Sequence, residues 1–85
     1  MRHFATPEFW SAYNRLPEHV RRQADRHFVL LKNDPRHASL HLKRIGRLWS
    51  VRLGIGDRAL GTIEGDDIVW FWIGSHADYD NMLKR

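Results

Sequence analysis

Two kinds of hydrophobic periodicity divide the chain. Between residues 6 and 33, apolar side chains recur every three or four positions, which is the spacing of one helix face. From residue 39 onward, apolar and polar residues alternate, which is the spacing of a strand with one buried face. The pattern therefore predicts helices first and strands afterwards, with the helices packed on one face of a mainly antiparallel sheet.

The helical half carries signals that start and stop helices. Thr6-Pro7-Glu8 offers a hydroxyl cap, a proline at the first helical position and an acid in the first turn. Pro17 ends this helix and begins another, and Asn33-Asp34-Pro35 stops the second, because the residue before a proline avoids the α region. We expect a helical hairpin over residues 6–33, preceded by a short first strand in residues 1–5.

The second half predicts three strands and a final helix. The alternation and the turn residues place the strands at 48–54, 58–64 and 68–74. The last of these is apolar on both faces, so it should lie inside the sheet. Ser75 and Asp78 form a capping pattern that opens a short helix packed through Tyr79, Met82 and Leu83. We expect one small α+β domain over residues 1–85, with a sheet of about four strands and a short C-terminal helix.

Composition narrows the class of protein. The 85 residues suffice for one small domain, and the absence of cysteine excludes disulfides and thiolate metal sites. No signal peptide is visible, and no apolar run approaches the roughly 18 residues of a membrane span. We therefore expect a soluble, cytoplasmic protein with no membrane partner.

Positive charge is concentrated in the first two thirds of the chain. The formal net charge is +4, and most of the cations are arginines that precede residue 59. Arginine is suited to bidentate contact with phosphate or carboxylate groups. A basic domain of this size indicates a nucleic acid or an acidic protein as its partner. The alternative is that the charge serves only solubility.

The main candidate site combines cations of the strand region with one histidine. Alternation turns Arg52 away from the face that Trp49 and Val51 use. Arg58 opens the neighbouring strand across the turn, and His76 follows the end of the next strand. If these strands are adjacent, two guanidiniums and an imidazole share a concavity on the solvent face of the sheet.

This set of side chains is suited to phosphodiester cleavage. Arg52, Arg58 and Lys43 would hold the phosphate and stabilise the charge of the transition state, and His76 would transfer a proton near neutral pH. RNA supplies its own nucleophile, the 2′-hydroxyl, so no serine or cysteine is needed. A position in the first turn of a helix would also attract phosphate toward His76. The alternative is a solvated sheet surface beside a histidine of a helix cap.

Further candidates lie near the same residues. Tyr79 follows His76 by three positions and would stack on a base or donate its hydroxyl to a phosphate, unless it packs the last helix on the sheet. His41 is a second candidate for proton transfer. His37 and His41 have the spacing of zinc ligands on a helix, but they follow a helix-stop signal and lack a third ligand, so we expect no metal and no cofactor.

The four tryptophans have two interpretations. They could form a stacking platform for bases, but core packing is better supported. Trp49 lies on the apolar face of its strand. Strict alternation places Trp70 and Trp72 together on one face of the strand at 68–74.

The order and spacing of several segments carry a family resemblance that covers nearly the whole chain. These segments are the helical hairpin ending in Asn33-Asp34-Pro35, then Leu42–Ile45, Leu48–Leu53, Asp57–Leu60 and Ile68–Tyr79. They resemble the RelE/ParE superfamily of bacterial toxin–antitoxin toxins. The end of the chain is similar to proteins described as cytotoxic translational repressors.

The resemblance implies a small αβ toxin that cleaves mRNA, usually at the ribosome, without metal or cofactor. The 2′-hydroxyl would attack and a cyclic phosphate would form. A small acidic antitoxin would neutralise the toxin by wrapping over its basic groove. Lys43, Arg52, Arg58, His76 and Tyr79 are the catalytic candidates carried over by position, and the RNA- or phosphate-binding candidates are His41, Arg44 and Arg47.

Three alternatives stay open at this point. One branch of the superfamily has the same fold but poisons gyrase, and a silent relative would only bind its antitoxin. A basic domain that binds nucleic acid without toxicity is the third. The presence of His76 and Tyr79 favours the ribonuclease, because a gyrase-directed toxin needs no proton-transfer group there.

Overall fold

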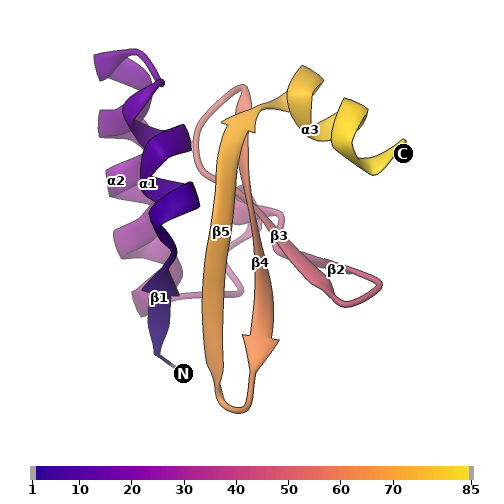
Figure 1. The fold of residues 1–85 in the computed structure, drawn as a ribbon. Helices are drawn as coiled ribbons and strands as arrows, with labels where there is room; N and C mark the ends of the chain where they lie inside the picture. The colour runs from indigo at the N-terminus through magenta and orange to yellow at the C-terminus, as the bar shows by residue number, and fades with distance from the viewer. Residues whose placement is uncertain (1, 85) are drawn as a thin grey trace.

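The computed structural model describes residues 2–84, which form three α-helices and five strands (Figure 1). The elements in chain order are β1 (His3–Ala5), α1 (Pro7–Asn14), α2 (Glu18–Asn33), the 3₁₀ turn η1 (Ala38–Leu40), β2 (Lys43–Ile45), β3 (Leu48–Arg52), β4 (Asp57–Glu64), β5 (Asp67–Ser75) and α3 (His76–Leu83). The predicted α+β fold with an N-terminal helical hairpin and a short last helix is confirmed. Met1, part of the expected first strand, lies outside the described residues.

Local capping explains where the helices begin. The hydroxyl of Thr6 accepts a hydrogen bond of 3.1 Å from the backbone N–H of Phe9, and Pro7 is the first residue of α1. Pro17 separates α1 from α2. In α3, the Ser75 hydroxyl accepts from the backbone N–H of Asp78 at 3.1 Å, as the capping pattern predicted.

The five strands form one sheet in the order β1-β5-β4-β3-β2. Neighbouring strands are antiparallel except β1, which runs parallel to β5. The predicted number of about four strands was one too low, because residues 43–45 form a short strand of their own. A turn at Gly46, whose φ of 59° favours glycine, folds this strand back onto β3. The internal position of β5 is confirmed.

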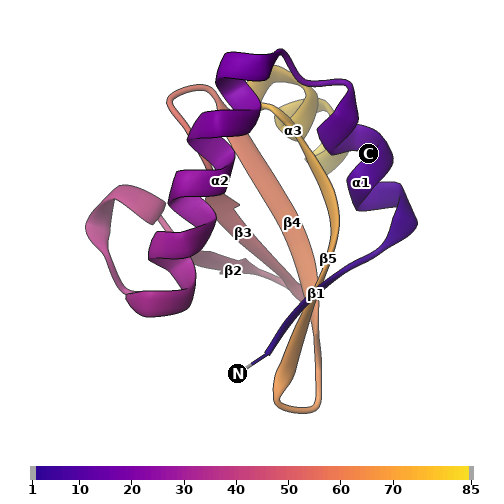
Figure 2. The same ribbon diagram turned by 90° about the vertical axis from the view of Figure 1, so that its left-hand side faces the viewer.

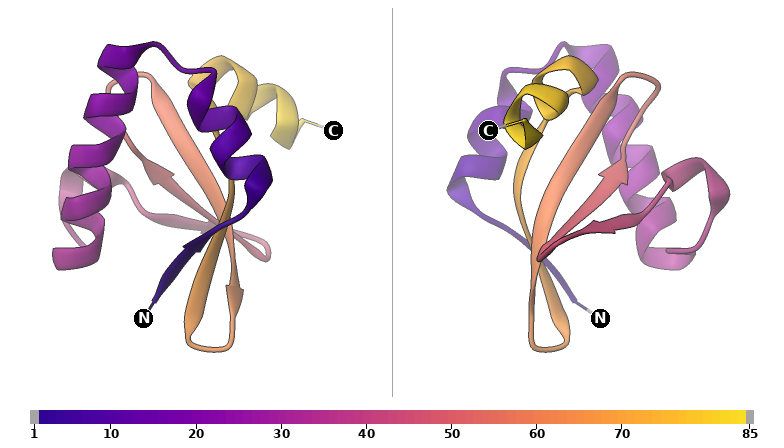
Figure 3. Two further views of the ribbon diagram at one scale, coloured as in Figure 1. Left: turned by 60° about the vertical axis from the view of Figure 1, so that its left-hand side comes forward. Right: turned by 90° about the vertical axis from the view of Figure 1, so that its right-hand side faces the viewer.

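Helices α1 and α2 cover one face of the sheet, and α3 lies on the other side near the end of β5 (Figures 1 and 2). The core lies between the two helices and the sheet. Its buried side chains come from both layers and include Phe9, Ala24 and Leu31 of the helices and Val51, Ala59, Trp70 and Ile73 of the strands. Figure 3 shows how strongly the sheet twists beneath the helices.

An irregularity in the β4–β5 pairing changes the expected placement of two tryptophans. The register shifts between Leu60 and Gly61. Trp70 is fully buried on the helix side, whereas Trp72 pairs with Leu60 and covers Gly74 on the opposite side. The prediction that the two indoles share a face was therefore wrong, because a bulge interrupts strict alternation.

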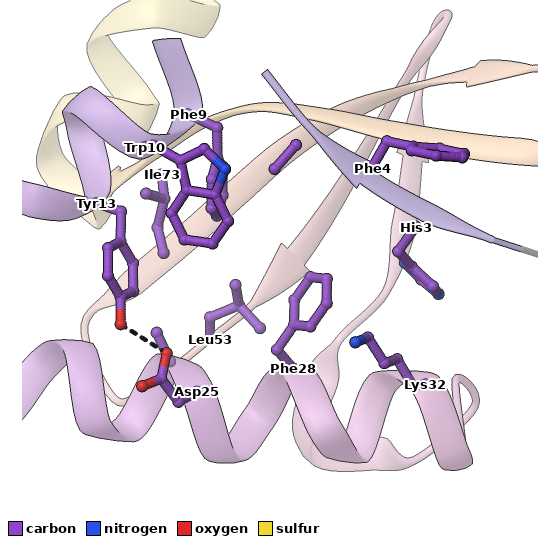
Figure 4. A pocket seen from close by; sticks show the side chains of 12 residues that line it. His3, Phe4, Phe9, Trp10, Tyr13, Asp25, Phe28, Lys32, Leu53 and Ile73 are labelled. Carbon is purple, nitrogen blue, oxygen red and sulfur yellow. Dashed lines mark hydrogen bonds between the residues drawn. The ribbon is translucent and has the colours of Figure 1, made fainter. Parts of the chain in front are cut away.

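The helix side also contains an apolar cavity of about 430 Å³ (Figure 4). At one end, the hydroxyl of Tyr13 donates to Asp25 Oδ1 at 2.8 Å. Toward the other end lies His3, whose ring stacks parallel to the indole of Trp70. The indole Nε1–H of Trp70 donates to His3 Nδ1 at 3.1 Å, so the first strand is tied to the core through a neutral imidazole nitrogen.

Candidate nucleic-acid interface

Cross-strand pairing brings the cationic side chains of the predicted site together on the sheet face that α1 and α2 do not cover. Arg52 of β3 is directly opposite Arg58 of β4, and Lys43 of β2 is opposite Ser50 of β3. Paired residues of an antiparallel ladder point to the same face. The side chains of Lys43, Ser50, Arg52 and Arg58 therefore share the face of the sheet away from the two long helices.

A small polar concavity forms where these strands meet the start of α3. It has a volume of about 230 Å³, and its lining includes His41, Arg52, Arg58 and His76. The backbone N–H of His76 donates to the carbonyl of Gly56 at 2.8 Å, which fixes the start of α3 against the β3–β4 turn. Residues far apart in sequence thus meet in one place, as the alternation and strand order predicted.

Arg58 is held as a buried cation. Only 6% of its surface is exposed. Its Nε donates to the Ser50 hydroxyl at 2.7 Å, its Nη2 donates to the carbonyl of His41 at 2.9 Å, and the guanidinium lies 5.2 Å from the ring centroid of Tyr79. Burial lowers the pKa of Arg58, and the neighbouring Tyr79 opposes that shift. The prediction of a solvent-facing Arg58 was wrong, because the last helix covers it.

Arg52 is the more accessible guanidinium. Its Nε donates to the carbonyl of Gly54 at 3.2 Å and its Nη2 to that of Ile55 at 3.3 Å, so the β3–β4 turn orients the side chain. Ile55 itself is 81% exposed at the tip of this turn. The arrangement places a half-buried, oriented cation at the mouth of the concavity.

His76 has an acidic neighbour that the sequence analysis missed. It is the first residue of α3, and its Nε2 lies 3.5 Å from Asp80 Oδ2. The side chain of His76 is largely exposed, and that of Asp80 is half-exposed. The signal was present in the sequence, since residues four apart on a helix face each other. His76 therefore meets a carboxylate partner within its own helix.

Tyr79 packs the last helix on the sheet, which was the alternative to a role in base stacking. It is 2% exposed, and its buried hydroxyl has no hydrogen-bond partner within residues 2–84. Lys43 Nζ lies 5.9 Å from its ring centroid, and the His76 ring stacks on it at 5.7 Å. The ring of Tyr79 is thus in contact with Lys43, Arg58 and His76. The other apolar residues expected to pack this helix, Met82 and Leu83, are substantially exposed.

Two of the predicted RNA-binding arginines lie elsewhere. Arg44 pairs with Trp49, which turns its side chain to the helix side of the sheet, and Arg47 lies in the turn between β2 and β3. His41 is left-handed, with φ 43° and ψ 46°, and lies before β2 rather than within it. Its carbonyl accepts from Arg58 Nη2, and His41 is among the residues that line the concavity, whereas Arg44 and Arg47 are not.

The histidine pair at 37 and 41 does not assemble into a larger cluster. His37 Nδ1 lies 2.8 Å from the Ser39 hydroxyl and accepts from the Ser39 backbone N–H at 3.2 Å. Across residues 2–84, no three His, Asp or Glu side chains come together in a group that could hold a metal ion. No helix within that range is long and apolar enough to cross a membrane.

Solved toxin structures resemble this chain over nearly its whole length. The RelB–RelE antitoxin–toxin complex from Methanococcus jannaschii matches with a TM-score of 0.71 and 16% identity, over 93% of this chain and 96% of that chain. YafQ from E. coli strain BL21(DE3) matches with a TM-score of 0.72 and 10% identity, over 93% and 98%. The isolated E. coli RelE toxin matches with 0.64 and 17%, over 99% and 96%.

The chain therefore has the RelE-like fold, which confirms the fold implied by the sequence motifs. Identities of 10–17% establish likeness of fold and leave function to be argued from the site. No protein-family model and no curated protein sequence matches the chain.

Proposed function

We propose that this protein is the toxin of a bacterial type II toxin–antitoxin system and a metal-independent endoribonuclease that cleaves mRNA. The observation that carries the proposal is the meeting of Arg52, Arg58, His41 and His76 in one concavity of a RelE-like fold. Two arginines and two histidines line this small hollow, and these residue types are suited to phosphate binding and proton transfer.

We assign two roles to the side chains of the concavity, phosphate binding and proton transfer. Arg52 contacts the phosphate directly from the mouth of the concavity. Arg58 contributes a fixed positive charge from its buried position, which stabilises the extra negative charge of the transition state without reorganisation. Lys43, exposed beside Tyr79, adds charge along the path of the RNA backbone.

The reaction needs one proton removed and one delivered. The 2′-hydroxyl loses its proton to a base, and its oxygen bonds to phosphorus as the bond to the 5′-oxygen breaks. The products are a 2′,3′-cyclic phosphate and a 5′-hydroxyl that has gained a proton. His76, with Asp80 at its Nε2, is the proposed principal proton-transfer group, and His41 is the candidate for the second step.

The proposed partners follow from the same assignment. Solved relatives include RelE proteins in complex with RelB antitoxins, from Methanococcus jannaschii and from E. coli. We infer an acidic antitoxin for this chain and a cytoplasmic site of action on mRNA, in association with the ribosome. The basic face that carries Arg52 and Lys43 is the surface that such RNA would approach.

Expression in a bacterial host tests the proposal. The parent chain should arrest growth and produce mRNA fragments with cyclic phosphate ends. His76→Ala should slow cleavage by about a hundredfold or more, as expected for loss of a proton-transfer group. Arg52→Ala should produce a loss of similar order. Arg15→Ala is the matched control, because this arginine is exposed at the end of α1, outside the concavity.

The outcomes separate this function from its alternatives. Thermal unfolding of each purified variant must match the parent, so that lost folding is not mistaken for lost catalysis. Full cleavage by both His76→Ala and Arg52→Ala would refute the site. Growth arrest with intact RNA and an induced DNA-damage response would instead identify a gyrase-directed toxin.

A further inference from the structure

The apolar cavity on the helix side of the sheet takes no part in the proposed function. It has a volume of about 430 Å³, and small-molecule sites typically have volumes of roughly 300–1,000 Å³. Its lining residues come from β1, α1, α2 and β5, together with Leu53 after β3. None of them lines the concavity around His76. The cavity is therefore a separate candidate for a ligand site.

Aromatic rings form much of the wall of this cavity. The rings of Trp10 and Tyr13, both from α1, meet edge to face with 5.3 Å between their centroids. Phe28 projects from α2 toward the same space, with Leu53 beside it (Figure 4). Trp10 is 50% exposed, so part of its indole surface is free to be covered. Such a wall is suited to a flat aromatic ring, because aromatic rings pack favourably edge to face or offset-stacked.

One end of the cavity offers groups that attract an anion. Lys32 Nζ lies 4.9 Å from the ring centroid of Phe28, and Lys32 forms no ion pair within residues 2–84. His3 lies near it (Figure 4). Because His3 Nδ1 accepts the indole N–H of Trp70, the proton of this neutral imidazole is on Nε2, which is a further hydrogen-bond donor. This end therefore favours a negatively charged group.

The opposite end of the cavity carries a negative charge that already has a partner. The hydroxyl of Tyr13 donates to Asp25 Oδ1 at 2.8 Å, and this pair joins α1 to α2. A second anionic group on a ligand would be repelled by Asp25. The two ends thus differ in charge, and a ligand with a single anionic group would bind in one orientation.

We propose that this cavity binds a small planar aromatic carboxylate of one or two fused rings. The rings lie between Trp10 and Phe28, and the carboxylate points toward Lys32 and His3. The anion is favoured over a cation at Asp25, because Asp25 is already hydrogen-bonded while Lys32 has no ion-pair partner, and because the chain has a net charge of +4. The proposal is independent of the proposed function, since the two sites share no residue.

Calorimetric titration of the full chain tests the proposal with three probes of similar shape. Naphthoate carries the carboxylate, naphthylmethanol replaces it with a neutral hydroxyl, and naphthylmethylammonium reverses the charge. We expect naphthoate to bind the parent most tightly. Saturating naphthoate should also raise Tm, because a ligand that binds only the folded state stabilises it.

Removal of one charge then tests the anion-binding end of the cavity. Lys32→Gln should weaken naphthoate by about threefold or more and leave naphthylmethanol nearly unchanged, as expected for loss of one exposed ion pair. The matched control is Arg26→Gln, which removes one exposed cation of the same helix outside the cavity and should bind like the parent.

Removal of one ring tests the aromatic wall. Trp10→Ala should weaken naphthoate and naphthylmethanol alike, by about tenfold, because both probes lose the same ring contact. Val29→Ala is the control, since Val29 is 58% exposed on α2 and does not line the cavity. Thermal unfolding of each variant without probe checks that its fold is intact.

Several results would overturn the inference. These are no binding of naphthoate by the parent, tighter binding of naphthylmethylammonium, equal weakening in Lys32→Gln and Arg26→Gln, or unchanged binding in Trp10→Ala. Tighter binding of the ammonium probe would assign the cavity to cations at Asp25. Failure of the proposed function is a separate result, because RNA cleavage is measured without any of these probes.

Discussion

Removal of the buried hydroxyl of Ser50 tests how the guanidinium of Arg58 is held in place. Ser50 is completely buried, and its Oγ accepts the Nε–H of Arg58 at 2.7 Å. In Ser50→Ala, this N–H of a buried cation loses its partner, and a methyl group is too small and apolar to replace it. Hydrogen bonds to charged groups contribute about 1.5–3 kcal/mol, so we expect the free energy of unfolding to fall by about 2 kcal/mol.

Urea and thermal unfolding measure this change. For a domain of this size, about 2 kcal/mol corresponds to a fall in Tm of roughly 8–16 °C. The control is Ser11→Ala, at an exposed position of α1, where we expect a change below about 0.5 kcal/mol. If the toxin assignment holds, Ser50→Ala should also reduce cleavage, since Arg58 loses one of its two anchors.

A double-mutant cycle isolates the cause. In the background of Arg58→Met, the guanidinium is gone and Ser50→Ala should cost less than about 0.5 kcal/mol, which leaves a coupling energy of about 1.5–2 kcal/mol. An equal cost in both backgrounds would refute the reasoning, because the loss would then come from packing around Ser50 rather than from an unpaired cation.

Two further predictions concern the core and the sheet. Burial, with a smaller effect of Lys32, lowers the pKa of His3 below its ordinary value of about 6.5, so the unfolded chain binds the proton first as the pH falls. The stabilising contribution is complete above about pH 6.5 and is lost on acidification, so His3→Gln should flatten the curve of unfolding free energy against pH in this range. Gly74→Ala should cost about 1–3 kcal/mol, because the added Cβ would collide with the indole ring of Trp72 at Cζ2. Chemical denaturation measures it.

The controls for these two predictions lie in the same molecule. Gly56→Ala adds a methyl group with no atom within 4 Å, so it should be nearly neutral, and a similar cost for both glycine variants would contradict the steric argument. For the histidine, His27→Gln is the comparison. If His27→Gln flattens the pH curve as strongly as His3→Gln, the burial of His3 is not the cause.

Sequence signals carried by neighbouring residues predicted the fold well. Thr6 and Ser75 cap their helices as expected, because a cap needs only the three residues that follow it. The meeting of Arg52 and His76 also followed from alternation and strand order. The spacing of four residues between His76 and Asp80 also indicates their contact from the sequence alone.

Other features of the fold depend on contacts between residues far apart in the sequence, which a local sequence pattern does not reveal. The bulge that separates Trp70 from Trp72 is a property of the β4–β5 register, and either indole alone is compatible with both faces. Arg58 is buried because the ring of Tyr79 packs over it, and Tyr79 lies twenty-one residues further along the chain. Alternation assigns a face to a side chain, but it does not say what covers that face.

The parallel pairing of β1 with β5 makes the sheet depend on both the start of the chain and a strand near its end. His3 lies beside Ile68, so the first strand can complete the sheet only after the chain has returned across more than sixty residues. Because the entropy of closing this long loop must be paid before the pairing forms, we expect these contacts to form late in folding. A chain interrupted before β5 would lack the internal strand of the sheet and the histidine of the concavity. We therefore expect products truncated before β5 to be inert.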